Sequence, residues 1–353
     1  MNTIELLTPE DGMTTSELQA FRSADSDQRA TSAGEPDRPG CCALPWAASG
    51  QTPDDRSVPR PVCFAWQEST TASESRVFDL YIATEPTFAC PLVFSELPQP
   101  YRHVLNLRTG TRYYWKVVAR DGRSVLAASA VRSFTTHPAP PRWLYVPGTT
   151  NVRDMGGWSL PGNRRVRQGL VYRSSEMNGH VDITDDGKRV LVEEVGIRTD
   201  VDLRGSNGPA MAVLDESRVT WVNIPIKPYD NIITDSESYR QVFEVLSDPS
   251  TYPILFHCWG GCDRGGTVAY LLHAVLGLDP EDLIRDYELS SHSIWGARSH
   301  RSDEFQSLLT ALLPFGDGND DMPARVERYL LSIGTTADSI AAIRENLIEA
   351  TDD

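Results

Sequence analysis

A short run of residues in the second half of the chain limits the fold most strongly. Residues 253–256 are apolar, residues 257–266 are rich in glycine, and residues 268–278 are apolar at helical spacing. This order predicts a strand, a tight loop and a helix. Such a loop can turn its backbone N–H groups towards one centre at a helix N-terminus, where an anion binds.

Two reactive side chains, Cys258 and Arg264, flank this loop. A thiol attacks as the thiolate, and its free pKa of about 8.5 leaves it mostly protonated at neutral pH. The helix N-terminus, the converging N–H groups and the arginine all favour the thiolate. A planar guanidinium also holds two phosphate oxygens in parallel, which an ammonium group cannot do. The sequence therefore predicts a site at which a cysteine attacks a phosphate.

The residues around this pair are expected to bind the phosphate or to support the loop. His257 is expected to orient the loop and to help set the pKa of the thiol. Arg153 and Asp154 precede a Gly-Gly turn and either brace the site or form a plain salt-bridged turn. The expected phosphate-binding residues are Trp259, Gly260, Gly261, Cys262, Asp263 and Arg264, with Thr267 as a further supporting residue.

In these motifs the chain resembles the cysteine-dependent phosphatases of protein-tyrosine and dual-specificity type. The loop is similar to the His-Cys-x-x-Gly-x-Asp-Arg-Thr-Gly loop of bacterial tyrosine phosphatases. The resemblance covers about residues 144–350 and includes segments 151–157, 197–204 and 286–290. It implies a phosphomonoester hydrolase, foremost a protein-tyrosine phosphatase, that forms a phosphocysteine on Cys258 and uses no metal or cofactor. The implied substrate is a phosphorylated protein or a small phosphomonoester.

The chain departs from this family at two positions. Gly265 stands where the family has Thr or Ser, whose hydroxyl stabilises the leaving thiolate, so slow turnover of the phosphocysteine is expected. Cys262 stands where relatives that act on phosphoinositides carry Lys, which weakens a lipid-phosphate interpretation. Dual-specificity, phosphoinositide and sugar phosphatases stay open as alternatives.

Two aspartates compete for the role of general acid. Asp202 ends a predicted parallel strand, where α/β sheets present their site residues. Asp263 lies in the loop itself, as in myotubularin-like phosphatases. The sequence slightly favours Asp202. Two other functions also stay open: sulfur transfer at a rhodanese-type loop, and a catalytically weak module that only binds phosphate.

The N-terminal half predicts an all-β sandwich. Short apolar runs at 62–66, 77–82, 101–107, 113–119 and 128–135 alternate with turn signals, and 4–14 would form a first strand with a bend. The pattern resembles a fibronectin type III domain over residues 1–138, with Tyr113 as its tyrosine corner and Trp66 in its core. Residues 18–60 have no periodicity and are expected to be a long insertion or a disordered tail. This domain is expected to be a spacer or a docking module for a protein partner.

The C-terminal half predicts an α/β domain over residues 144–353, after a proline-rich linker at 137–142. Strands are expected at 166–173, 197–203 and 254–256, in a mainly parallel central sheet flanked by helices. The expected helices cover 184–195, 237–247, 268–278, 280–287, 302–313, 324–333 and 337–350.

The charge and the apolar runs of the chain exclude several other classes. A net charge of −16 argues against nucleic acid and against an anionic membrane surface. No apolar run reaches 18 residues, so no membrane span is expected. The first residues lack a basic segment followed by an apolar one, so no secretory signal is visible, although a trimmed leader stays open. A reactive thiolate suits a reducing compartment, and a cytoplasmic location is expected.

Overall fold

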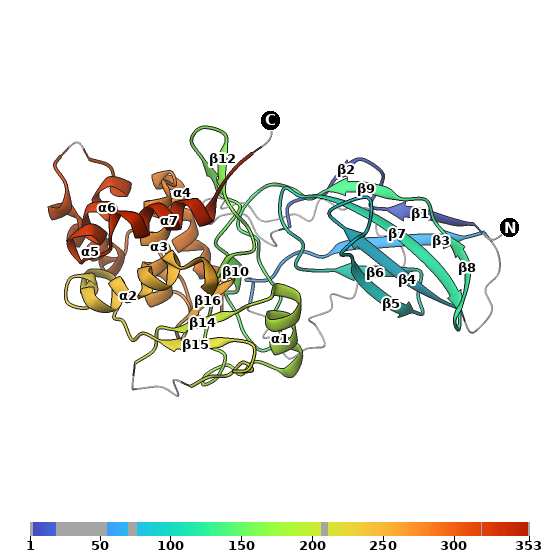
Figure 1. Ribbon diagram of the computed structural model, residues 1–353, viewed down its shortest axis with the longest axis horizontal. Coiled ribbons are helices and arrows are strands. Elements are labelled where there is room, and N and C mark those ends of the chain that lie inside the picture. Colours follow the sequence, from blue (N-terminus) through green and yellow to red (C-terminus); the bar gives the residue numbers. More distant parts are fainter. Residues whose placement is uncertain (1–2, 19–54, 70–75, 206–210, 319, 352–353) are drawn as a thin grey trace. The chain divides into compact units, whose positions relative to one another are not determined.

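The computed structural model describes residues 3–18, 55–69, 76–205, 211–318 and 320–351. Tertiary contacts divide them into two units (Figure 1). The first unit holds 3–18, 59–69 and 76–139, and the second holds 55–58 and 140–351. The insertion expected at 18–60 lies mostly outside the described residues. No helix in the described ranges has the length and apolar character to cross a membrane.

The first unit is built from two β-sheets. One sheet has the order β1 (Ile4–Thr8), β3 (Val62–Glu68) and β6 (Tyr101–Val104). The other has the order β2 (Met13–Thr14), β9 (Arg132–Thr135), β7 (Arg112–Asp121), β4 (Arg76–Ala83) and β5 (Leu92–Leu97), with β8 (Ser124–Ala128) paired to β7. The expectation of a strand-rich N-terminal region is therefore confirmed.

Alternating residues of these strands form the core of the first unit. Phe64 and Trp66 of β3 meet Leu80 and Trp115 of the other sheet, and all four are buried. The hydroxyl of Tyr113 accepts a hydrogen bond of 2.9 Å from the backbone N–H of residue 108. This is the contact that a tyrosine corner makes, while the fibronectin type III assignment stays a prediction. Strand β5 was not predicted, because most of its side chains are exposed and give no apolar alternation.

The second unit is built around a sheet with the order β10 (Arg153–Asp154), β13 (Val171–Ser174), β16 (Ile254–His257), β14 (Thr199–Asp202) and β15 (Thr220–Asn223). Strand β10 is antiparallel to β13, and the other three pairings are parallel. In this register Ser174, His257 and Asp202 lie side by side. The carboxyl ends of three neighbouring strands therefore meet at the start of the glycine-rich loop.

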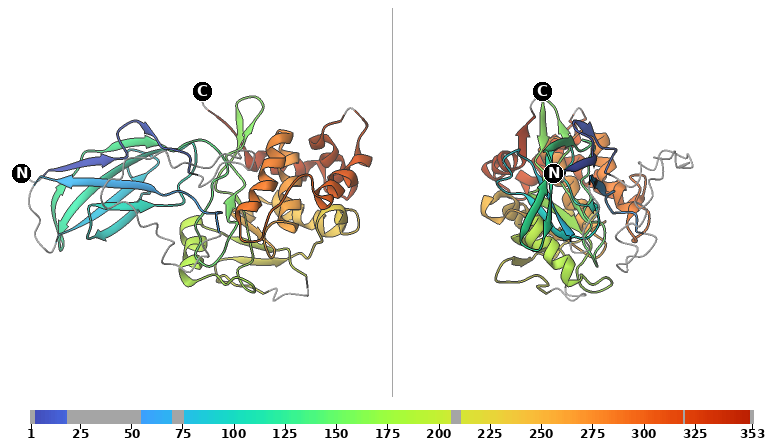
Figure 2. Two further views of the ribbon diagram at one scale, coloured as in Figure 1. Left: turned by 180° about the vertical axis from the view of Figure 1, so that it is seen from behind. Right: turned by 90° about the vertical axis from the view of Figure 1, so that its right-hand side faces the viewer.

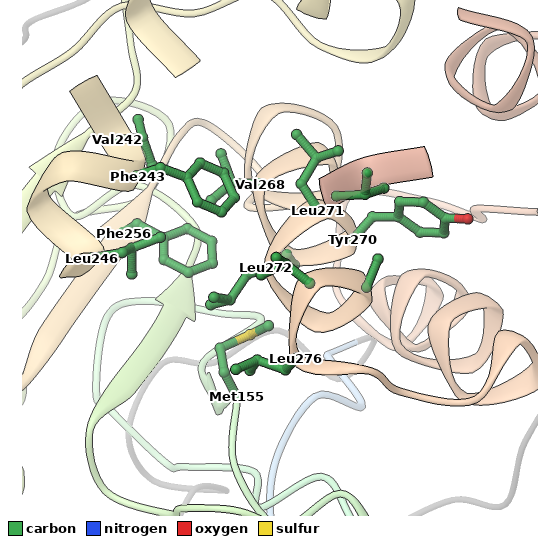
Figure 3. Close-up of a cluster of buried hydrophobic side chains, with 14 of the residues drawn as sticks. Met155, Val242, Phe243, Leu246, Phe256, Val268, Tyr270, Leu271, Leu272 and Leu276 are labelled. Carbon is green, nitrogen blue, oxygen red and sulfur yellow. The ribbon is translucent and has the colours of Figure 1, made fainter. Parts of the chain in front are cut away.

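Helices cover both faces of this sheet. α1 (Asp185–Arg189) and the π-helical turn 190–195 pack on one face. The other face is covered by α2 (Ser236–Ser247), α3 (Arg264–Leu276), α4 (Pro280–Leu289), α5 (Asp303–Leu312), α6 (Met322–Ser332) and α7 (Ala337–Leu347). Figures 1 and 2 show α1 and α3 on opposite sides of β16. In Figure 3, Phe256 of β16 lies between side chains of α2 and α3 in the larger core.

Two expectations for this unit need correction. The strand expected at 166–173 is two strands, β12 (Arg164–Val166) and β13, because a turn with Gly169 at a φ of 93° separates them. The last helix ends at Leu347 rather than at 350. Residues 348–350 form β17, which pairs with β12 beside β11 (Ser159–Leu160). The ends of these strands and of α7 depend on pairing between strands far apart in the sequence, which a local sequence pattern does not encode.

Candidate active site

The glycine-rich loop begins where β16 ends and finishes where α3 begins. Because side chains alternate along a strand, Phe256 and Cys258 join the core on the side of α3, whereas His257 lies on the other side with Leu255. Cys258 is only 2% exposed. Its side chain is therefore buried where the loop begins, and its role as nucleophile stays a prediction.

Groups outside the loop hold three successive carbonyl oxygens. Trp259 O accepts from the N–H of Glu176 (2.8 Å), Gly260 O from Asn151 Nδ2 (2.9 Å), and Gly261 O from Arg173 Nη2 (2.5 Å). In a trans peptide the next N–H points the opposite way. In the described ranges, no backbone N–H of residues 259–263 donates to another protein group. These N–H groups are thus free to converge on a bound anion.

Two glycines let the loop pack this closely. Gly261 has a φ of 67°, and a Cβ there would lie 2.2 Å from the carbonyl oxygen of Ser174. A Cβ on Gly260 would lie 2.8 Å from the ring of Trp295. A side chain at 261 would push the loop away from the end of β13, and one at 260 would displace the loop or the ring of Trp295.

Arg264, the first residue of α3, lies at the mouth of the loop. Its guanidinium stacks on the ring of Trp259, with 5.2 Å from Cζ to the ring centroid. Both residues line two hollows of about 680 and 290 Å³. Within the described part of the chain the guanidinium makes no ion pair, so its donors are available to a ligand.

The two candidate acids lie in different surroundings. Asp263 lines the larger hollow, and its carboxylate is 40% exposed. It accepts two hydrogen bonds from Arg298, of 2.9 and 3.0 Å, and one from the hydroxyl of Tyr229. Asp202 lines neither hollow, is fully buried, and binds the guanidinium of Arg204 through both oxygens. Arg204 is itself buried.

His257 packs against a carboxylate on the neighbouring strand. Its Nε2 lies 3.1 Å from Asp200 Oδ1, and both residues are buried. Burial lowers the pKa of His257, but the charges of Asp200 and Asp202 outweigh it, so the pKa is raised. The neighbouring strand β14 therefore holds the imidazole at the point where the loop begins. A supporting role for His257 stays a prediction.

A buried ion cluster braces the loop from behind. Arg153 and Arg173 both bind the carboxylate of Asp286, at 2.9 and 2.8 Å. Burial raises the pKa of Asp286, but the two guanidinium groups outweigh it and hold the pKa well below its usual range. Asp154 instead accepts bonds from the N–H groups of Gly156 and Gly169, so it holds a turn. Of the two residues proposed as braces, Arg153 shares the carboxylate of Asp286 with Arg173, which binds the loop, whereas Asp154 holds a turn.

The other loop residues are tied into the protein. Cys262 is fully buried, its Sγ donates to Gly260 O at 3.2 Å, and burial raises the pKa of its thiol. The hydroxyl of Thr267 donates to Asp263 O and accepts from the N–H of Tyr229. Beside Gly265 a Cβ would meet only the ring of Phe256, at 3.8 Å. Among the described residues, no cluster of three or more His, Cys, Asp or Glu could hold a metal.

Sequence reasoning missed the residues that shape the loop from outside. Asn151, Arg173 and Glu176 received no role, although each binds a loop carbonyl. The available signal was local: a polar run follows the apolar start of β13, at the strand end that faces the loop. Asn151 adopts a φ of 58°, which no sequence pattern announces.

Comparisons with known proteins agree with this geometry. The family model described as "Tyrosine phosphatase family" matches residues 144–349. A putative tyrosine-protein phosphatase of Cupriavidus necator is 30% identical over 166 residues, which cover 39% of this chain and 59% of the relative. A tyrosine-protein phosphatase of Nostoc commune is 24% identical, over 31% of this chain and 46% of the relative.

A third relative is matched over more of its length. The "Triple specificity protein phosphatase PtpB" of Mycobacterium tuberculosis is 24% identical over 257 residues, which cover 58% of this chain and 88% of the relative. The chain thus spans about half the length of the first two relatives and most of the third. With a matching family model over more than half of its residues and a loop of the geometry described above, this chain belongs to the tyrosine phosphatase family.

Proposed function

We propose that this protein is a phosphomonoester hydrolase, foremost a protein-tyrosine phosphatase, that acts through a phosphocysteine on Cys258. One observation carries the proposal. Support comes from a buried sulfur at the start of a loop whose backbone N–H groups at 259–263 donate to no group in the described ranges, and from the Arg264 guanidinium at the other end of that loop, which forms no ion pair there. This arrangement suits a tetrahedral dianion.

The reaction then proceeds in two displacements. The Cys258 thiolate attacks phosphorus, the bond to the leaving oxygen breaks, and a carboxylic acid protonates that oxygen. Water next attacks the phosphocysteine, the same carboxylate takes the proton, and the thiolate leaves. Arg264 and the loop N–H groups balance the charge of the phosphoryl oxygens in both steps. This scheme requires no metal or cofactor.

We propose Asp263 as the general acid in preference to Asp202. An acid must reach the leaving oxygen above the loop, and Asp263 lines the hollow there whereas Asp202 is buried against Arg204. In the first step Arg298 would have to give up part of its contact with Asp263, so that the carboxyl can carry the proton.

Leaving-group dependence distinguishes the two acids. A good leaving group such as p-nitrophenolate needs little protonation, whereas phenolate needs much. Asp263→Asn should therefore lower kcat for phenyl phosphate far more than for p-nitrophenyl phosphate. Asp202→Asn should affect both substrates alike. The reverse result would return the role to Asp202.

The walls of the larger hollow favour an aryl phosphate. Trp259, Tyr229 and Tyr287 line it, and the exposed indole of Trp259 offers an aromatic surface against which a phenyl group can pack. The Mycobacterium relative is named for triple specificity, so dual-specificity and phosphoinositide or sugar-phosphate substrates form the second candidate. Rates on phosphotyrosine and phosphoserine peptides of one sequence, and on a short-chain phosphoinositide, distinguish these classes.

The central experiment tests the nucleophile. The full chain should release phosphate from p-nitrophenyl phosphate, and Cys258→Ser should abolish release while still binding orthovanadate. Rapid acid quenching of the wild type should trap a phosphocysteine. Release of thiocyanate from thiosulfate and cyanide would instead support sulfur transfer. Binding of vanadate without any turnover by the wild type would support the weak phosphate-binding module.

The first unit is proposed as a docking module. Its two sheets and the hydrogen bond of Tyr113 support a fibronectin type III-like assignment, and domains of this kind bind proteins through varied surfaces. A cytoplasmic location is proposed because a reactive thiolate survives in a reducing compartment. Fractionation of the source cells would test it.

A further inference from the structure

Residues 55–58 belong to the second unit although they lie far before the region that the family model matches. We call this segment the strap. The family model begins at residue 144, whereas the strap ends three residues before the start of β3 at Val62. Ser57 and Val58 are both buried, at 2% and 4% exposure. The N–H of Arg56 donates to the carbonyl oxygen of His292 at 2.8 Å.

The hydroxyl of Ser57 lies at the centre of the strap's polar contacts. It accepts a hydrogen bond of 2.8 Å from the backbone N–H of Asn151 and donates to Asp55 Oδ1 at 2.5 Å. It also lies 3.0 Å from the hydroxyl of Thr150. All its hydrogen-bonding capacity is thus used, and the buried N–H of Asn151 is satisfied from outside the family region.

Asn151 in turn acts directly on the phosphate loop. Its Nδ2 donates to Gly260 O at 2.9 Å and lies 3.5 Å from the sulfur of Cys262. Its Oδ1 accepts from Arg153. The residue is fully buried at a φ of 58°, a conformation that a non-glycine residue keeps only when its surroundings hold it. The hydrogen bond from its N–H to Ser57 is one of those holds.

We propose that Ser57 is a positioning residue of the phosphate loop. Through Asn151 it fixes the Gly260 carbonyl outward and hence the N–H of Gly261 inward, towards the anion. The inference rests on the proposed function of the loop. It makes the site dependent on a segment that lies outside the catalytic family region and leads directly into the first unit.

The test compares Ser57→Ala with Thr336→Ala in the full chain. Both changes remove one hydroxyl that accepts a backbone N–H, at Asn151 and at Ser339 respectively, and Thr336 caps α7 away from the loop. Tungstate affinity reports the loop without turnover, and kcat on p-nitrophenyl phosphate reports the reaction. A buried N–H left without an acceptor should weaken tungstate binding and lower kcat by about tenfold in Ser57→Ala. Thr336→Ala should keep the wild-type tungstate affinity and kcat, although its unfolding midpoint should fall by about as much as that of Ser57→Ala.

The outcomes separate this inference from the proposed function. Suppose that the wild type hydrolyses substrate. The inference would then be overturned if Ser57→Ala and Thr336→Ala lost tungstate affinity and kcat equally, or if Ser57→Ala kept the wild-type tungstate affinity. A wild type that binds tungstate but never hydrolyses would overturn the proposed function and leave the binding comparison to decide on Ser57. If Ser57→Ala does not fold, the test uses Asp55→Asn, which weakens the hydrogen bond that holds the Ser57 hydroxyl. This variant should bind tungstate severalfold more weakly than the wild type. Unchanged binding would overturn the inference.

Discussion

Replacing Gly261 by alanine should open the phosphate loop while leaving the fold in place. A Cβ at this position would lie 2.2 Å from Ser174 O and 2.6 Å from Ser174 C, where ordinary contacts begin near 3.4 Å. Both atoms are backbone at the end of β13, held in register with His257. The strand end therefore cannot yield, and the loop has to retreat.

Two contributions set the size of the effect. Alanine in the left-handed conformation costs about 1–2 kcal/mol more than glycine. The retreat also removes the charged hydrogen bond from Arg173 to Gly261 O, which is worth about 1.5–3 kcal/mol. A combined loss of about 3 kcal/mol corresponds to roughly a hundredfold in kcat/KM, if the undistorted loop is needed in the transition state.

The matched control is Gly265→Ala, four residues further along in the same loop-to-helix junction but with room for a methyl group. A Cβ there meets only the side chain of Phe256, at 3.8 Å, and alanine in a helix gains up to about 1 kcal/mol over glycine. We expect Gly265→Ala to melt at or above the wild-type temperature and to bind orthovanadate normally. Gly261→Ala should lose both kcat/KM and vanadate affinity. If Gly261→Ala kept more than a tenth of the wild-type kcat/KM, the proposed loop geometry would be refuted.

Three further changes test other parts of the site. Gly265→Thr should speed breakdown of the phosphocysteine, because a hydroxyl there would stabilise the leaving thiolate and a Cβ at 265 meets only the ring of Phe256, at 3.8 Å; pre-steady-state kinetics should then show a smaller burst, and an unchanged burst would contradict this. Asp286→Asn leaves two buried arginines without their carboxylate, so chemical denaturation should show a loss of about 3–5 kcal/mol; a loss below 1 kcal/mol would count against the brace. The pKa of His257 is raised in the folded state, so its pairing with Asp200 stabilises below pH 6.5 and is lost as pH rises through the folded pKa. The stability gap between wild type and His257→Gln should therefore shrink from pH 6 to pH 9, and a gap that widens would disprove the pairing.

The sequence predicted the strand, loop and helix of the site better than the residues that support the loop. Cys258, Arg264 and the glycines between them lie within seven residues of one another. A local sequence pattern was therefore enough to predict the strand, the loop and the helix that present them. Asn151 and Arg173 reach the loop from other parts of the chain, and Asp286 of α4 binds Arg173. Their contacts depend on strand pairing across long stretches of chain, which no local period encodes.

The choice between the two aspartates shows the same limit. Both are acidic residues at the end of a strand or in a loop, and the sequence slightly favoured Asp202. The carboxylate of Asp202 is buried because β14 pairs with β16 and because Arg204 folds back onto it. Asp263 lines the hollow instead. Burial and ion pairing are properties of the surroundings rather than of the residue type, so they could not be predicted from composition.

By itself the sequence determined that this chain carries a cysteine and an arginine on a glycine-rich turn between a strand and a helix, because those residues are neighbours and their geometry is local. The tertiary structure alone decided which carbonyls turn outward, which acid faces the hollow, and that a serine before the first unit's β3 accepts a hydrogen bond from the backbone of Asn151. These outcomes depend on hydrogen bonds between segments far apart in the chain, whose partners become defined only once the sheet has closed around them.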